Sequence, residues 1–116
     1  MEPIKTGIIG FGRVAGNHLN AMRECGLYDV KIVCDITESR REAAIEEELE
    51  ATDSLDALLD SDIELALITT HSSAHYADAL KVAAAKKHII VEKPMALTGP
   101  EAEEMVAAAK ENGVAL

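Results

Sequence analysis

The chain has 116 residues, which is enough for one domain with a hydrophobic core and too few for two. Apolar residues make up 48% and aromatic residues only 3%, so the composition excludes a disordered chain and predicts a core of aliphatic side chains and methionine. The net charge of −10 argues against nucleic acid or an anionic membrane as a partner. No apolar run has transmembrane length and no signal-peptide pattern opens the sequence, so we expect a soluble, cytoplasmic protein.

Residues 4–9 form an apolar run, predicted as a strand, that leads into a glycine-rich turn. Residues 10–15 read Gly-Phe-Gly-Arg-Val-Ala, and an amphipathic helix is predicted over 13–25, ended by Gly26. This order of strand, glycine turn and helix is the context that a dinucleotide-binding fingerprint requires. In such a fingerprint Gly10 allows the tight turn, Gly12 lets the backbone approach a pyrophosphate, and Ala15 lets the helix pack closely on the strand. The alternative is an ordinary glycine turn between a strand and a helix.

The rest of the chain alternates strands and helices in the manner of βαβ units. Further strands are predicted over 30–34, 51–52, 63–69, 88–92 and, begun only, 114–116; further helices are predicted over 37–50, 54–59, 74–86 and 98–112, with Thr37, Asp53 or Ser54, Ser72 or Ser73, and Thr98 as caps. This alternation predicts an α/β fold with a doubly wound parallel sheet, a single three-layer domain over residues 1–116. A final strand that stops after three residues suggests that the sequence is part of a longer protein.

Helical spacing predicts which side of each later helix is buried. The expected inward residues are Ala44, Ile45 and Leu49 in the second helix, Tyr76, Leu80, Ala83 and Ala84 in the fourth, and Ala102, Met105, Val106 and Ala109 in the last. Cys25 and Cys34 are expected to be small core or near-core residues. No CxxC motif or zinc-like spacing accompanies them, so we expect neither a disulfide nor a metal site.

An acidic residue stands where a dinucleotide-binding fold places its ribose ligand. Asp35 ends the second predicted strand, 20 residues after Ala15 (35 − 15). An aspartate there accepts hydrogen bonds from the adenosine ribose and repels the extra phosphate of NADP, which favours NAD; capping of the next helix is the alternative. Arg40 and Arg41 follow shortly after this strand, and an arginine there can accommodate the 2′-phosphate of NADP. NADP is therefore not excluded as the cofactor. The alternative is that both arginines are solvated helix residues.

Two more strands end in polar residues, and parallel strands end at the same edge of a sheet. Residues 69–75 after the fourth strand read Thr-Thr-His-Ser-Ser-Ala-His, which predicts that Thr70 and His75 face a bound cofactor. A histidine at a helix start is, alternatively, a surface or capping residue. The fifth strand ends in Glu92-Lys93-Pro94, for which the alternative is a simple polar turn.

Together these motifs resemble the Gfo/Idh/MocA oxidoreductase family, which includes glucose–fructose oxidoreductase and inositol dehydrogenase. The resemblance rests on the turn at 10–15, on Asp35, on Thr70 with His75, and on Glu-Lys-Pro-Met-Ala at 92–96. It spans the whole chain and matches the family's N-terminal nucleotide-binding half. The resemblance implies NAD(P)-dependent oxidation or reduction of a sugar, cyclitol or related small polyol, in a protein that forms homo-oligomers when full-length.

The resemblance also implies residue roles. Lys93 is the implied catalytic residue, because a lysine beside an oxidised nicotinamide should have a lowered pKa and can relay a proton from the reacting hydroxyl. The implied cofactor-binding residues are Gly10, Phe11, Gly12, Arg13, Val14, Asp35, Arg40, Thr70, His71, His75, Glu92 and Lys93.

The chain departs from the family pattern in two ways. His71-Ser72 replaces the family's usual Pro-Asn, so the role of His71 stays open. The family's second half, which supplies most of the substrate pocket and the oligomer interface, is absent, so we expect this chain alone to be inactive. A stand-alone NAD(H)-binding or sensing module is the competing hypothesis, and a different Rossmann reductase, of the dihydrodipicolinate reductase type, is a third.

Overall fold

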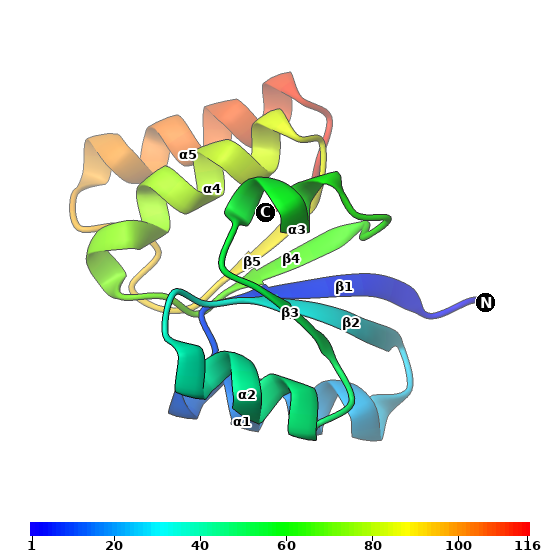
Figure 1. Ribbon diagram of the computed structural model, residues 1–116. Helices are drawn as coiled ribbons and strands as arrows, with labels where there is room; N and C mark the ends of the chain where they lie inside the picture. The colour runs from blue at the N-terminus through cyan, green and yellow to red at the C-terminus, as the bar shows by residue number, and fades with distance from the viewer.

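The computed structural model describes all of residues 1–116 as a five-stranded, all-parallel sheet with helices on both faces (Figure 1). The strand order is β3-β2-β1-β4-β5, which confirms the predicted doubly wound α/β fold. The elements are β1 Ile4–Ile9, α1 Arg13–Cys25, β2 Tyr28–Cys34, α2 Glu38–Glu46, β3 Glu50–Thr52, α3 Leu55–Asp60, β4 Leu65–Ile68, the 3-10 turn η1 Ser72–Ala74, α4 His75–Ala84, β5 His88–Val91 and α5 Gly99–Glu111.

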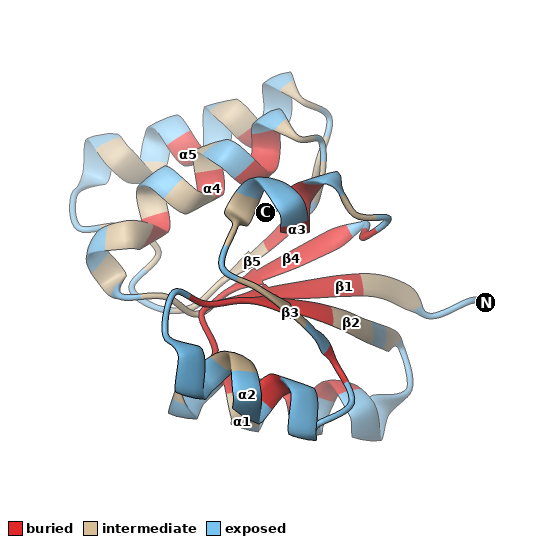
Figure 2. Ribbon diagram, viewed as in Figure 1, coloured by how far each residue is buried: buried red, intermediate tan, exposed pale blue.

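The helices form two layers that enclose the sheet. Helices α1 and α2 cover one face and α3, α4 and α5 cover the other (Figure 1). Successive strand residues point to opposite faces, so Ile8 joins the core under α1 while Ile9 joins the core under α4 and α5. The buried residues concentrate in the middle strands and on the inner sides of the helices (Figure 2). This burial on both faces explains why the strands read as continuous apolar runs.

The second helix is shorter than predicted. Helix α2 ends at Glu46, and Glu48 takes a left-handed conformation with φ of 65° that turns the chain toward β3. Leu49 is still buried, but it lies beyond the helix, and Ile45 is 61% exposed rather than inward. Ala44 is therefore the one core residue that this helix contributes.

Helix α4 is rotated by one residue from the predicted orientation. Its buried side consists of His75, Ala79, Val82 and Ala83, whereas Ala84 is exposed and Tyr76 and Leu80 are half-buried. The predicted stripe left out His75, which was predicted to face a cofactor, and so began one residue too late. No serine side chain caps this helix, because Ser72 and Ser73 belong to the 3-10 turn that precedes it.

Two helix starts follow the predicted capping chemistry, whereas Thr37, the N-cap residue of α2, makes no capping hydrogen bond with its side chain. The Ser54 hydroxyl accepts a hydrogen bond from the Ala57 N–H at 3.1 Å, and the Thr98 hydroxyl accepts one from the Glu101 N–H at 3.3 Å. In α5, Met105 and Ala109 are buried, Ala102 is half-buried, and the predicted inward Val106 is 44% exposed.

The structure also bears on the predicted last strand, on the two cysteines and on membrane-spanning segments. Residues 114–116 form no strand, although the Ala115 carbonyl accepts a hydrogen bond from the Ile89 N–H of β5 at 2.9 Å. Both cysteines are free as expected, but Cys25 is exposed and only Cys34 is buried. None of the helices has the length and apolar character needed to cross a membrane.

Candidate functional site

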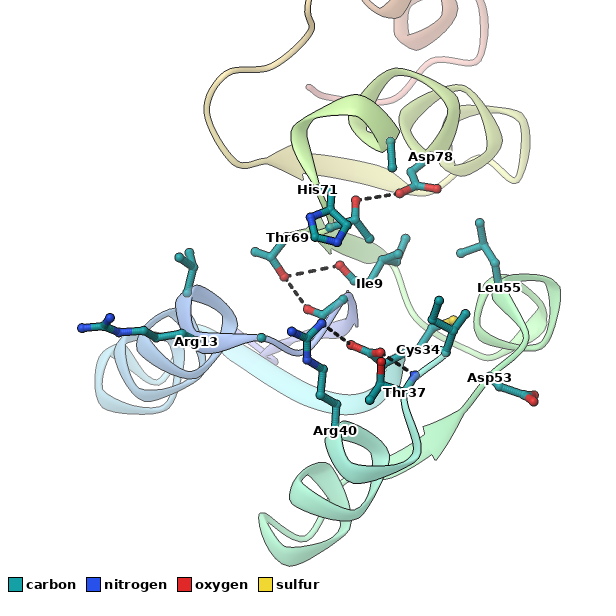
Figure 3. Close-up of a pocket in the computed structure, with 17 residues that line it drawn as sticks. Ile9, Arg13, Cys34, Thr37, Arg40, Asp53, Leu55, Thr69, His71 and Asp78 are labelled. Carbon is teal, nitrogen blue, oxygen red and sulfur yellow. Dashed lines mark hydrogen bonds and ion pairs between the residues drawn. The ribbon is translucent and has the colours of Figure 1, made fainter.

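A pocket of about 490 Å³ opens at the carboxyl edge of the sheet, where β1, β2, β3 and β4 end (Figure 3). Ile9, Cys34 and Thr69 lie at the ends of three of these strands and line it. The first turns of α1 and α4 complete the wall. The residues predicted from the glycine turn, from the end of the second strand and from the end of the fourth strand are therefore brought together in one cavity.

The glycine turn after β1 requires glycine at its first position. Gly10 has a φ of 87°, and a Cβ atom there would lie 2.9 Å from the Thr70 backbone nitrogen and 3.0 Å from the Thr69 carbonyl oxygen. The turn is also tied to its neighbours, because the Gly10 N–H donates to the Cys34 carbonyl at 2.8 Å and the Thr69 hydroxyl donates to the Gly10 carbonyl at 2.5 Å. Only glycine combines this conformation with so close an approach of three strand ends.

The N-terminus of α1 faces the pocket without a capping side chain. Gly12 is the N-cap residue, and the first turn contains no acidic residue that would occupy the N–H groups. Gly12, Arg13 and Val14 all line the pocket. Free N–H groups and the partial positive charge of a 13-residue helix make this end of α1 suited to an anion such as a phosphate.

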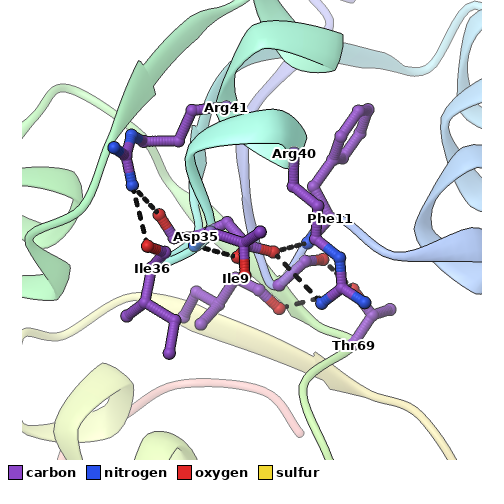
Figure 4. Close-up of polar contacts among 9 residues, drawn as sticks. Ile9, Phe11, Asp35, Ile36, Arg40, Arg41 and Thr69 are labelled. Atoms are coloured by element: carbon purple, nitrogen blue, oxygen red, sulfur yellow. Dashed lines mark hydrogen bonds and ion pairs between the residues drawn. The ribbon is translucent and has the colours of Figure 1, made fainter.

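Asp35 lies beside this helix start, at the end of β2, with its side chain only 4% exposed (Figure 4). Its Oδ2 accepts from the Phe11 N–H at 2.8 Å, and its Oδ1 accepts from the Thr37 N–H at 2.8 Å. A carboxylate has about four acceptor positions, so these two bonds leave capacity for hydroxyl groups in the pocket. The Thr37 contact also shows that the local role weighed for Asp35, holding the start of the next helix, coexists with its position in the pocket.

The two arginines of α2 have different positions. The Arg40 Nη1 atom lies 3.7 Å from Asp35 Oδ2, and the half-exposed guanidinium lines the pocket. Arg41 instead donates to the carbonyls of Asp35 and Ile36, both at 3.0 Å, and so fixes the loop after β2 (Figure 4). Arg40 is thus placed to meet a ligand, and Arg41 supports the loop that holds Asp35.

Several lining residues were not predicted as site residues. Cys34 was expected only in the core, yet it lines the pocket, and burial together with the nearby Asp35 carboxylate raises its pKa to about 11. It is therefore a neutral thiol near pH 7. Asp53 follows β3 and could have been found by the same strand-end rule that selected Asp35. Asp78, which accepts from the Thr70 hydroxyl at 2.8 Å, lies within a helix, where no pattern indicates it.

Four predicted cofactor contacts do not line the pocket, and the first two are Phe11 and His75. The Phe11 side chain is buried, and its backbone N–H serves Asp35. His75 is only 1% exposed and does not face the pocket as predicted. The reason is the orientation of α4, which turns this ring inward toward the carbonyls of Thr70 and Pro94. Of the predicted residues near it, Thr70 and His71 do line the pocket.

The segment after β5 lies outside the pocket lining. Glu92 Oε2 is 2.6 Å from His18 Nε2 of α1, and this hydrogen bond holds the pKa of Glu92 below its usual value. Lys93 is exposed, and neither Glu92 nor Lys93 is among the pocket residues. Their predicted contacts with a cofactor or substrate stay predictions.

Comparison with known proteins gives a family match over residues 4–116, to an oxidoreductase family with an NAD-binding Rossmann fold. The inositol 2-dehydrogenase of Salmonella paratyphi B is 31% identical over 115 residues, which cover 95% of this chain and 34% of that protein. The scyllo-inositol 2-dehydrogenase (NADP(+)) of Bacillus subtilis is 34% identical over 125 residues, covering 100% of this chain and 33% of that protein. The chain thus spans about a third of the length of the curated relatives it matches.

Solved structures show the same similarity in three dimensions. The WlbA dehydrogenase from Bordetella pertussis, crystallised in complex with NADH and UDP-GlcNAcA, superposes with a TM-score of 0.93 at 30% identity. The match covers 97% of this chain and 34% of that chain.

Proposed function

The chain belongs to the Gfo/Idh/MocA family of oxidoreductases, and we propose that its pocket binds a nicotinamide dinucleotide with the pyrophosphate at the start of α1. One observation carries this proposal: the uncapped N-terminus of α1 and the buried carboxylate of Asp35 line the same cavity. The first suits a phosphate and the second suits a ribose hydroxyl pair. Residues 1–116 then constitute one dinucleotide-binding domain.

Each part of the cavity takes a part of the dinucleotide. Gly10 and Gly12 let the backbone approach the pyrophosphate, and the N–H groups of Arg13 and Val14 donate to it. Thr70 and His71 follow β4 and also line the pocket, and in this proposal they face the half of the dinucleotide that carries the nicotinamide. Phe11 contributes only its backbone, through the bond that orients Asp35.

We propose NAD rather than NADP as the preferred cofactor. The Asp35 carboxylate would lie against a 2′-phosphate and repel it. Arg40, 3.7 Å from that carboxylate, is the one lining cation placed to reduce this repulsion, so binding of NADP is weakened rather than abolished.

Fluorescence titration of the chain with NADH and NADPH tests both the binding of a dinucleotide and the preference for NAD. We expect NADH to bind at least tenfold more tightly than NADPH. Asp35→Ala should weaken NADH binding by roughly 10- to 100-fold, the size expected for the loss of hydrogen bonds to a charged acceptor. The same change should reduce the ratio of NADH affinity to NADPH affinity. Asp29→Ala removes an exposed carboxylate at the other end of β2 and should change neither affinity. A clear NADPH preference in the unaltered chain would refute the NAD assignment.

A protein that joins this domain to the rest of the family's chain is proposed to transfer a hydride between the nicotinamide and a sugar, cyclitol or related polyol. The nicotinamide supplies the hydride chemistry, and Lys93 holds or accepts the proton of the reacting hydroxyl. In that protein Lys93→Ala should lower kcat by roughly 10²-fold or more. Lys110→Ala, an exposed lysine in the last turn of α5, is the matched control. Unchanged turnover in Lys93→Ala would exclude the proton-transfer role.

The 116-residue chain alone is proposed to bind the dinucleotide without turnover, because the curated relatives are about three times as long. Incubation with NAD and myo-inositol, followed by absorbance of NADH, should show no reduction. A second candidate, a stand-alone binding module, gives the same result for this chain. The longer protein distinguishes the two candidate functions. A binding module would show no turnover of any polyol that depends on Lys93, whereas an oxidoreductase would.

A further inference from the structure

His18, in the second turn of α1, is joined to Glu92, which directly follows β5, although 74 residues separate the two along the chain. The His18 Nε2 atom lies 2.6 Å from Glu92 Oε2, and 36% and 28% of the two side chains are exposed. Strand β5 is at the edge of the sheet, two strands away from β1. This contact is the one side-chain hydrogen bond that joins α1 to the segment after β5.

The hydrogen of this bond belongs to the histidine ring. The Glu92 carboxyl is ionised near pH 7, because the bond from His18 lowers its pKa and the Lys93 N–H contributes to the same effect. An ionised carboxylate can only accept a hydrogen bond. His18 therefore donates from Nε2, and it does so whether the ring is neutral or charged.

Lys93 lies between two anchored residues. The Glu92 N–H donates to the Ile68 carbonyl of β4 at 3.0 Å, which fixes the main chain at the end of β5. On the other side, the Pro94 carbonyl oxygen lies 2.8 Å from a ring nitrogen of His75 in α4. Lys93 itself is exposed, and its ammonium group makes no ion pair within the chain. The direction in which the Lys93 side chain leaves the sheet is therefore set by its neighbours and not by contacts of its own.

We propose that His18 is a positioning residue for Lys93, and that it acts by holding the Glu92 carboxylate against α1. The N-terminus of the same helix lines the pocket through Arg13 and Val14. His18 is five residues after Arg13, about 7–8 Å further along the helix axis. One rigid helix thus carries both the anion-binding end of the pocket and the group that holds the start of the Lys93 segment. The link itself stands independently of any cofactor, whereas its consequence for Lys93 rests on the proposed function.

Three variants separate this role from a general contribution to folding. His18→Leu removes the donor and keeps an apolar side chain, whereas His18→Gln keeps an N–H donor at about the position of Nε2. Asn20→Leu places the same leucine on an exposed position of the same helix and is the matched control. A partly exposed pair contributes little to global stability, so all three should keep urea midpoints close to that of the unaltered chain. A large loss of stability in His18→Leu would overturn the positioning role in favour of a structural one.

Hydrogen exchange of the Lys93 amide, followed by NMR in the 116-residue chain, measures the link directly. His18→Leu frees the Glu92 carboxylate and should speed this exchange roughly tenfold, the size expected for the loss of one hydrogen bond to a charged group. His18→Gln should restore most of the protection, and Asn20→Leu should leave the exchange rate unchanged. Equal rates in His18→Leu and the unaltered chain, or no recovery in His18→Gln, would overturn the proposal.

The consequence for Lys93 is measured in the longer protein proposed above. There His18→Leu should lower kcat roughly tenfold with little change in the KM for NAD, because a misplaced proton-transfer group slows turnover without removing cofactor contacts. With Lys93→Ala already in place, His18→Leu should lower kcat no further. An unchanged kcat in His18→Leu, or a loss confined to KM, would refute the positioning of Lys93.

NADH titration of the 116-residue chain keeps this proposal apart from the proposed function. Absence of NADH binding in the unaltered chain contradicts the proposed function, while the Lys93 amide alone decides whether His18 holds the segment after β5.

Discussion

Replacing Gly10 with alanine should destabilise the fold more than any other glycine replacement near the pocket. The residue has a φ of 87°, and an L-residue in the left-handed region costs about 1–2 kcal/mol. The added Cβ would also lie 2.9 Å from the Thr70 nitrogen and 3.0 Å from the Thr69 carbonyl carbon, both backbone atoms that cannot turn away. Overpacking of this kind costs about 1–3 kcal/mol, so we expect a total loss of about 2–5 kcal/mol.

Two other glycines separate these contributions. Gly26 also has a positive φ, of 71°, but a Cβ there meets nothing within 4 Å, so Gly26→Ala should cost only the backbone part, about 1–2 kcal/mol. Gly16 lies inside α1 with open space around it and no unusual φ, so Gly16→Ala should stabilise the chain by about 0.5–1 kcal/mol.

Urea unfolding followed by far-ultraviolet circular dichroism measures all three free energies on one scale. The predicted order of stability is Gly16→Ala, then the unaltered chain, then Gly26→Ala, then Gly10→Ala. A domain of this size has a total stability of about 5–15 kcal/mol, so Gly10→Ala could be partly unfolded in buffer. If Gly10→Ala costs no more than Gly26→Ala, the approach of the Thr69–Thr70 backbone is not the constraint on this turn.

Three further predictions follow from other parts of the chain. Cys25 should react with a thiol reagent at pH 8, and Cys34 should react far more slowly, because burial raises the pKa of Cys34 to about 11. Mass spectrometry identifies which cysteine carries the label. Preferential labelling of Cys34 would contradict this prediction. Glu92→Gln should destabilise the chain at pH 7, and urea unfolding at a series of pH values should show this loss shrinking as pH falls below about 4.5. The reason is that the bond from His18 lowers the Glu92 pKa, so the stabilisation is present above the ordinary value and is lost as pH falls through the lowered one; a loss that does not depend on pH would contradict this. Ser54→Ala should cost about 1 kcal/mol in urea unfolding by removing the cap of α3; an unchanged midpoint would show that the cap contributes nothing.

The strand ends were the most predictable part of the site. Gly10, Asp35 and Thr70 each follow an apolar run, and parallel strands place such residues at one edge regardless of how the helices pack. The same rule would have selected Asp53 after β3, but a three-residue strand with half-buried and exposed residues gives a weak pattern. Residues positioned by the sheet are therefore predictable wherever the strand itself can be recognised.

Residues positioned by helices were predicted less well. His75 was assigned to the pocket and excluded from the core because it is polar, yet α4 buries its ring and exposes Ala84. The pairing of Glu92 with His18 of α1, 74 residues earlier in the chain, was not predicted either, and the contact of Glu92 with a ligand stays a prediction. Both outcomes depend on partners from distant segments, a carbonyl in one case and an imidazole in the other, and hydropathy periodicity contains no information about such partners.

Asp35 joins the glycine turn to the loop that follows β2. Its carboxylate accepts from the Phe11 N–H inside the turn and from the Thr37 N–H before α2, so one buried side chain fixes both loops that form this side of the pocket. Asp35 thus has a structural role in the turn, in addition to the proposed contact with a ribose. It follows that replacing Asp35 changes loop geometry and ligand contacts together, and that the ratio of NADH to NADPH affinity, rather than either affinity alone, isolates the contact with the ribose.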